Sequence, residues 1–183
     1  MAKTSKVGRP AKAKSTLTKS AIMNVALPIL REKGVQELSF RVLAAELGVT
    51  AMAVSYHCGS KKELLRDLVE LGFRGTIDDV GLESSLKRVR EVLEKYCLRA
   101  LDNANLLRAV LDDTSLMSND LHTITDVLQA DLQKLGAEDD VLHLLIDYTH
   151  GFVLSASSGQ DNPLTIKDYL PGIDWVLNRL EIS

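Results

Sequence analysis

Apolar residues recur along this chain at intervals of three and four, the spacing that places them on one face of an α-helix. The first such stretch follows Thr18, whose side chain is suited to capping a helix, and runs from Ile22 to Leu30. Leu17, just before the cap, can pack onto Ile22 as a hydrophobic staple. The pattern predicts a helix that starts after Thr18 and ends at Gly34.

Three shorter helices are predicted in quick succession after it. The segment FRVLAAEL follows Ser39 as cap and stops at Gly48, and Thr50 then caps a third helix. Ser60 and Glu63 have the S-x-x-E spacing of a capping box at the start of a fourth, KKELLRDLVELGF. The first 75 residues are therefore expected to hold four capped helices.

The helical pattern continues to the end of the chain, and strand signals are absent. Apolar positions from Leu86 to Ala100 predict a long amphipathic helix. Further helices are predicted at about 105–111, 120–135, 138–157 and 166–181. The segment 138–157 is apolar almost all round, which places it in an interior or an interface. Together with the helix that carries Trp175, it could form a four-helix interface with a second copy, although a monomeric core would give the same pattern.

These patterns predict an all-α protein in three parts. Low hydrophobicity and charge make residues 1–16 a flexible basic arm, and residues 17–74 hold the four short helices. Residues 75–183 form a larger helical domain. The boundary is placed near residue 75 because glycines interrupt the pattern there and the charge balance changes sign.

Charge separates the two halves more sharply than the net value of −3 suggests. Residues 1–74 carry 13 Lys and Arg against 6 Asp and Glu, whereas residues 75–183 carry 9 against 19. A basic first half favours a polyanionic partner, although a solubilising tail would account equally well for the basic residues of the arm alone. Two cysteines, the lack of a long apolar run and the lack of a signal-peptide pattern favour a reduced, cytoplasmic setting without membrane insertion.

The second and third predicted helices, joined by a turn at Gly48, have the order of a helix-turn-helix, whose second helix enters the DNA major groove. At about 100° per residue, placing Val54 inward keeps Cys58 with it and directs Met52 and Tyr56 outward. An outward apolar ridge of this kind suits the thymine methyl groups of the major groove. Packing against a neighbouring helix of the same domain is the alternative.

Lys61 and Lys62 lie in the first turn of the fourth helix, where the helix dipole disfavours cations. The placement is explained if a phosphate group binds at this helix start. For either lysine alone, a solvated surface position remains the alternative.

Residues 18–70 resemble the DNA-binding domain of the TetR family of transcriptional regulators, through IMNVALPILREKGVQELSFRVLAAELGV, the short third helix and SKKELL. The segment HGFVLSAS at 150–157 also resembles part of the C-terminal domain of tetracycline-repressor-type proteins. The resemblance implies a homodimer that binds a palindromic DNA operator, with a C-terminal domain that dimerises and binds a small-molecule inducer. No cofactor, no membrane partner and no enzymatic activity are predicted for the chain.

The resemblance also assigns candidate DNA contacts position by position. Arg41 is the strongest candidate for reading a guanine, because its guanidinium can donate to O6 and N7 together. Where the family usually has tyrosine, this chain has Ser55, so one phosphate contact is weakened or moved to Tyr56. The full set of predicted DNA-contacting residues is Ser39, Arg41, Thr50, Ala51, Met52, Ala53, Ser55, Tyr56, His57 and Lys61.

His143, Asp147 and His150 form one stripe of the apolar helix at 138–157 and are the candidate ligand-binding residues. The spacing could hold a metal, but hydrogen-bonded core groups or contact with an inducer fit it better, and no metal site is predicted. No nucleophile with a base, carboxylate pair in a cleft or phosphate-binding glycine loop is visible, which argues against an enzyme.

The resulting hypothesis is a dimeric repressor that a small molecule releases from its operator. The alternative is an architectural DNA-binding protein without an inducer, in which the C-terminal half serves only for dimerisation. A cavity of a few hundred Å³ among residues 82–160 would favour the regulator.

Overall fold

The structure, a computed structural model, describes residues 17–81, 85–159 and 164–180. Within these ranges the regular secondary structure is helical throughout, as the sequence predicts. The predicted basic arm at 1–16 lies outside the described residues, as does the last residue of the helix predicted at 166–181. No helix in the described ranges combines the length and the apolar character needed to cross a membrane.

Four helices form the N-terminal part: α1 (Lys19–Glu37), α2 (Phe40–Leu47), α3 (Ala51–Cys58) and α4 (Lys61–Phe73). Each starts at the predicted cap, and the hydroxyls of Thr18, Ser39, Thr50 and Ser60 all accept a hydrogen bond from a backbone N–H three residues on. At the end of α1 the prediction holds in part. Gly34 breaks the helical geometry at φ 77° and ψ 179°, but α1 continues past it to Glu37.

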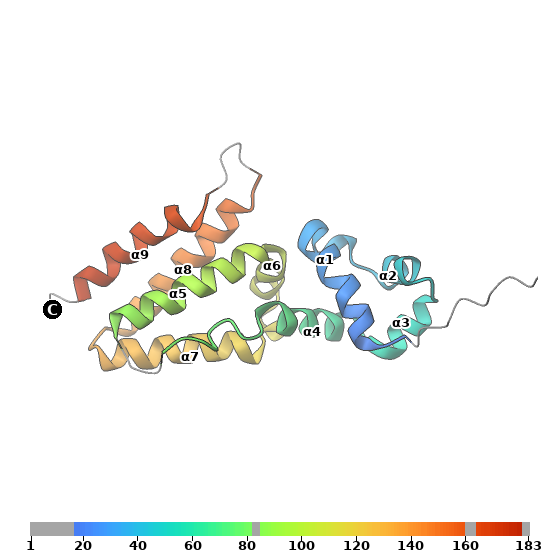
Figure 1. Cartoon of the computed structure of the whole chain (residues 1–183), viewed down its shortest axis with the longest axis horizontal. Helices are drawn as coiled ribbons and strands as arrows, with labels where there is room; N and C mark the ends of the chain where they lie inside the picture. Colours follow the sequence, from blue (N-terminus) through green and yellow to red (C-terminus); the bar gives the residue numbers. More distant parts are fainter. Residues whose placement is uncertain (1–16, 82–84, 160–163, 181–183) are drawn as a thin grey trace, which may run out of the picture.

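The C-terminal part holds α5 (Leu86–Asp102), α6 (Ala104–Asp112), α7 (Asn119–Lys134), α8 (Asp139–Ala156) and α9 (Ile166–Leu180). All five lie within a few residues of their predicted ranges. A short 3₁₀ turn, η1 (Thr114–Leu116), was not predicted, because three residues are too few to establish a helical period. In Figure 1, α5 lies among α7, α8 and α9, and it packs against all three.

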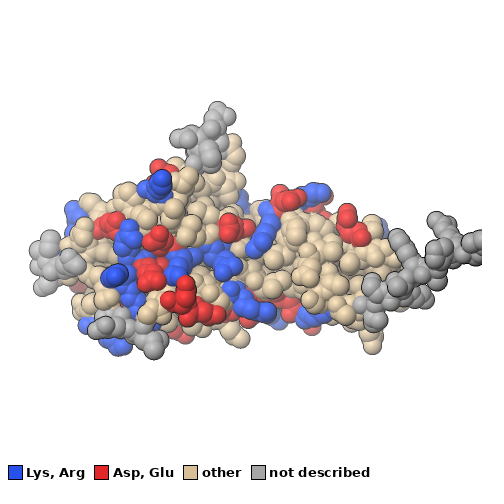
Figure 2. All heavy atoms as spheres, in the orientation of Figure 1, with Lys and Arg blue, Asp and Glu red and all other residues tan. Residues whose placement is uncertain are grey.

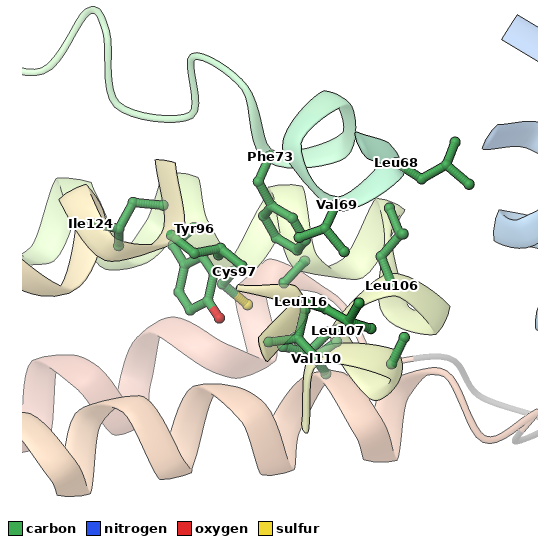
Figure 3. Packing of buried hydrophobic residues seen from close by; sticks show 14 of the residues in the cluster. Leu68, Val69, Phe73, Tyr96, Cys97, Leu106, Leu107, Val110, Leu116 and Ile124 are labelled. Carbon is green, nitrogen blue, oxygen red and sulfur yellow. The ribbon is translucent and has the colours of Figure 1, made fainter. Parts of the chain in front are cut away.

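Helix α4 connects the two parts and belongs to the packing of both (Figure 1). It contacts α1 and α3 on one side and α5, α6 and α7 on the other. Figure 3 shows Val69 and Phe73 of α4 pointing into the apolar cluster formed with Leu106 and Leu116, and both α4 side chains are fully buried. The buried cluster is therefore continuous from α1 to α9. The division at residues 74 and 75 stays a prediction.

Candidate functional site

Helices α2 and α3 meet at a turn whose geometry is set locally. Gly48 adopts the left-handed conformation at φ 66° and ψ 33°, and its N–H donates to the carbonyls that end α2. A residue with a Cβ would be strained there. Leu43 of α2 and Val54 of α3 are completely buried at the base of the turn. These features hold α3 at a fixed angle to α2, as in a helix-turn-helix.

Helix α3 has one buried and one exposed face. Val54 and Cys58 lie in the core, and burial raises the pKa of the Cys58 thiol, which keeps it protonated. On the other face, 83% of Met52 and 86% of Tyr56 are exposed. Packing of this pair against a neighbouring helix, the alternative considered from the sequence, therefore does not occur among the described residues. The outward apolar ridge is confirmed.

The polar groups near the ridge are accessible. Ser55 is partly exposed and its hydroxyl donates to the Gly59 carbonyl at 3.3 Å, and the His57 ring lies edge-on to Tyr56 with 5.3 Å between centroids. Arg41, in the first turn of α2, is exposed. Within the described part of the chain, no hydrogen bond or ion pair engages its guanidinium. Arg41 is thus available to an external partner.

The first turn of α4 differs from a simple open phosphate site. Lys61 is exposed but donates to the Val35 carbonyl at 3.0 Å, and Lys62 pairs with Asp113 at 2.9 Å. Glu63 closes the predicted capping box by accepting from the Ser60 N–H at 2.7 Å, and this hydrogen bond lowers the pKa of the Glu63 carboxyl. Lys62 therefore has a protein partner that explains its position without a phosphate. Lys61 keeps its predicted role only if it exchanges the Val35 carbonyl for an anion.

The positive charge predicted for the N-terminal half is concentrated outside the described residues. Between residues 17 and 74 the chain carries 8 Lys and Arg against 6 Asp and Glu, so most of the basic excess belongs to residues 1–16. On the face shown in Figure 2, basic and acidic side chains are interspersed over the C-terminal helices. The electrostatic attraction expected for DNA therefore depends strongly on the arm.

The three candidate ligand-binding residues of α8 do not converge on one site. His143 and Asp147 are exposed, whereas His150 is half-buried and its Nε2 lies 2.7 Å from the hydroxyl of Tyr96 on α5. Burial lowers the pKa of His150, and the charge of Asp147 opposes this shift. Among the described residues, no group of His, Cys, Asp and Glu is arranged to hold a metal.

Beside the Tyr96–His150 pair lies a small cavity of about 50 Å³ between α5, α6, α7 and α8. It is smaller than the few hundred Å³ that would favour a ligand-released regulator over an architectural protein. Tyr96 was predicted only as an apolar position of its helix, and no local signal pairs it with a histidine 54 residues away. The cavity is lined by Tyr96, Leu107, Val110, Met117, Leu121, Ile124, Thr125, Ile146 and His150.

Helices α8 and α9 leave an apolar surface between them. Leu144 is 53% exposed and Trp175 58%, although both are large apolar residues. They border a hollow of about 250 Å³ whose other lining residues are Leu145, Tyr148, Gly172 and Val176. The Arg179 guanidinium lies 3.5 Å from the Trp175 ring centroid and covers part of the indole. The surface has the character expected of a helical interface.

Residues 22–68 match the family model described as bacterial regulatory proteins, tetR family. That match spans α2, α3 and most of α1 and α4. The comparison with curated protein sequences gives no match.

Solved structures share the fold over nearly the whole chain. The structure is similar to that of Mycobacterium smegmatis BioQ, with a TM-score of 0.74 and 24% identity over 91% of this chain and 99% of that one. BioQ with its double-stranded DNA operator gives a TM-score of 0.73 and the same identity and coverage. A TetR variant from Acinetobacter baumannii in complex with minocycline gives 0.66, with 20% identity over 91% of this chain and 97% of that one.

Proposed function

We propose that the chain is a DNA-binding transcriptional regulator of the TetR family and that it acts as a homodimeric repressor, which a small molecule releases from a palindromic operator. One observation carries the DNA-binding part of this proposal. Met52 and Tyr56 are almost fully exposed on a short helix whose opposite face is core. An apolar ridge held in this way suits a major groove, where thymine methyl groups offer apolar contact.

The local geometry supports two kinds of contact among the predicted DNA-contacting residues, with bases and with phosphates. Arg41 at the start of α2 would donate to a guanine, while Met52, with Ala51 and Ala53 beside it, would meet thymine methyl groups. The hydroxyl oxygens of Ser39 and Thr50 accept from backbone N–H groups, which leaves their hydrogens free to donate to phosphate. The remaining predicted phosphate-contacting residues are Ser55, Tyr56, His57 and Lys61.

Dimerisation is proposed through the apolar surface of α8 and α9. The exposed Leu144 and Trp175 would be covered by the same surface of a second copy, as in an isologous two-fold interface. Two α3 helices would then reach successive major grooves, and this arrangement matches a palindromic operator. The BioQ structure with its operator shows that a protein of this fold binds duplex DNA.

An inducer site is proposed at the cavity beside the Tyr96–His150 pair. Of the three residues of α8 predicted to bind a ligand, only His150 lines it. Ligand pockets of drug size usually measure about 300–1,000 Å³, so a ligand would have to favour a state in which this cavity of about 50 Å³ is enlarged. The TetR variant with minocycline and Streptomyces coelicolor ActR with (S)-DNPA show that proteins of this fold bind small molecules.

The small cavity also favours the alternative function, an architectural DNA-binding protein without an inducer. The two functions predict different DNA selectivity. A repressor should enrich one palindromic sequence from random duplex DNA, whereas an architectural protein should bind most duplexes alike. Binding of the selected duplex is expected to weaken steeply as salt is raised, because phosphate contacts release counterions. DNA binding that does not depend on salt would contradict both functions.

The match to the TetR family model supports the expectation that the chain is not an enzyme.

Arg41→Ala should separate base reading from phosphate contact. Operator affinity is expected to fall by about 1–3 kcal/mol, and selection from random duplexes should lose preference at one base position. Lys61→Ala should instead weaken every sequence by a similar factor, because a phosphate contact carries no sequence information. The exposed Lys33 of α1 provides a charge-matched control, Lys33→Ala. Equal losses on all sequences for Arg41→Ala would remove the base-reading role of this residue.

A further inference from the structure

Asn103, at the start of α6, does not do what an asparagine at that position commonly does. Asparagine is among the preferred N-cap residues because its side chain accepts from the first backbone N–H groups of the helix. Here the Asn103 side chain makes no capping hydrogen bond. The residue is completely buried, and its amide is used to connect other helices.

The Asn103 amide connects α4, α5 and α6. Its nitrogen donates to the Gly72 carbonyl of α4 at 3.2 Å and to the Arg99 carbonyl of α5 at 2.8 Å. Gly72 approaches so closely that a Cβ there would lie 2.5 Å from a methyl of Leu106 and 3.1 Å from the Asn103 side-chain oxygen. Helix α4 is therefore in direct contact with the first turn of α6.

The same amide also reaches α1. The Arg31 Nε donates to the Asn103 side-chain oxygen at 2.8 Å, across 72 residues of sequence. Next to it, Asn105 donates to the Arg31 carbonyl at 3.0 Å. Helix α1 packs against α6 and also supports α2 and α3, so these two hydrogen bonds join the helix-turn-helix to α6.

Helix α6 also forms part of the cavity wall. Leu107 and Val110 of α6 line the cavity, as does Tyr96 near the end of α5. Protein interiors are close-packed, so a group that enlarges this cavity must displace its walls. The junction of α5 and α6, where Asn103 lies, is then a direct route from the cavity to α1.

A second polar contact joins the two parts at the other end of α6. Asp113 pairs with Lys62 of α4, and hydrogen bonds from Ser115 and Lys62 lower the pKa of Asp113 to about 2. The side chains of Lys62 and Asp113 are 52% and 45% exposed, and exposed ion pairs of this kind hold their partners only weakly. The fully buried Asn103 amide is the stiffer connection.

We propose that Asn103 is the positioning residue that couples the state of the cavity to the orientation of the DNA-binding helices, through its hydrogen bond with Arg31. The proposal rests on the proposed function, because it assigns the regulation of that same DNA-binding site. Arg31 is exposed, so the coupling can be broken at this residue without opening the core.

In the test, a larger side chain in the cavity wall takes the place of the unidentified ligand. Thr125 lies on the cavity wall in α7, away from α6, and Thr125→Phe would force the cavity to enlarge. The duplex selected from random DNA by the wild-type protein serves as the probe. Thr125→Phe is expected to weaken its binding about 10-fold, within the usual range of allosteric coupling. In the Arg31→Ala background the same substitution should weaken binding less than about 2-fold, because the link to α1 is lost.

Control variants distinguish loss of coupling from a general loss of stability. Thr125→Phe should keep its full effect beside Lys33→Ala, which removes a positive charge from the same helix, and beside Arg31→Lys, which retains a donor for the Asn103 oxygen. Asn103→Ala removes the oxygen that accepts from Arg31 together with both donated hydrogen bonds, and it is expected to reduce the effect as Arg31→Ala does. Circular dichroism melting confirms that each variant is folded.

Two results would overturn the coupling while leaving the proposed function intact. In one, Thr125→Phe changes operator affinity equally in the Arg31→Ala and Lys33→Ala backgrounds. In the other, it changes operator affinity in no background although the wild-type protein binds its selected duplex. Failure of the wild-type protein to enrich any duplex would instead overturn the proposed function, and the coupling with it.

Discussion

Replacing Trp175 by aspartate is expected to convert the proposed dimer into monomers and to weaken operator binding by more than about 100-fold. The indole borders the apolar hollow between α8 and α9, and a carboxylate at this position could enter an apolar interface only at a large desolvation cost. A dimer binds both half-sites of the operator at once, and linking two binding events in this way commonly raises affinity by about 10²–10⁴-fold. A monomer loses this increase in affinity.

Sedimentation or light scattering measures the change in oligomeric state, and titration of the selected duplex measures the change in affinity. Leu144→Asp, on the facing helix, should act in the same direction. Leu98→Asp is the matched control, because Leu98 is also an exposed leucine but lies on α5 at a separate polar hollow. If Trp175→Asp remained dimeric and bound the operator normally, the interface would have to lie elsewhere.

Asp131→Ala is expected to lower the free energy of unfolding by about 3–5 kcal/mol, the usual cost of leaving one member of a buried ion pair without its partner. Asp131 of α7 is buried and accepts from the Arg88 guanidinium of α5 at 3.0 Å. The pair joins α5 and α7, and both helices contribute residues to the cavity wall. Its loss should therefore also loosen the proposed ligand site.

Urea unfolding followed by circular dichroism gives the change in free energy. Asp79→Ala provides the comparison, because Asp79 pairs with Lys95 at 2.7 Å but is mostly exposed. The unfolding midpoint of Asp79→Ala should stay close to that of the wild-type protein, since exposed pairs contribute little. Similar midpoints for Asp131→Ala and Asp79→Ala would show that burial does not strengthen the Arg88–Asp131 contact.

The helices and the exposed Met52–Tyr56 ridge could be predicted because their causes are local. A helix start is capped when a hydroxyl side chain accepts a hydrogen bond from the backbone N–H three residues further on, which involves only neighbouring residues. All four predicted caps of this kind are present. The outward direction of Met52 and Tyr56 follows from the helical period once Val54 is buried. The end of α1 was predicted less well, because the segment after Gly34 returns to helical geometry.

The partners of the polar side chains could not be predicted in the same way. The lysines at the start of α4 suggested a phosphate site, but Lys62 meets Asp113, 51 residues further on. The stripe of His143, Asp147 and His150 suggested a shared ligand, but only His150 turns toward the interior and meets Tyr96. A regular spacing along one helix shows which side chains share a face, and it leaves open which other helix covers that face.

The sequence by itself determined the helical fold, the caps, the turn at Gly48 and the exposed Met52–Tyr56 ridge, because each depends on residues within one or two turns of one another. Only the tertiary structure decided the size of the cavity, the Tyr96–His150 pair and the bridging role of Asn103. These features depend on how several helices pack together, and the angles and distances of that packing are set by the whole core. The link proposed between the cavity and the DNA-binding helices belongs to this second group.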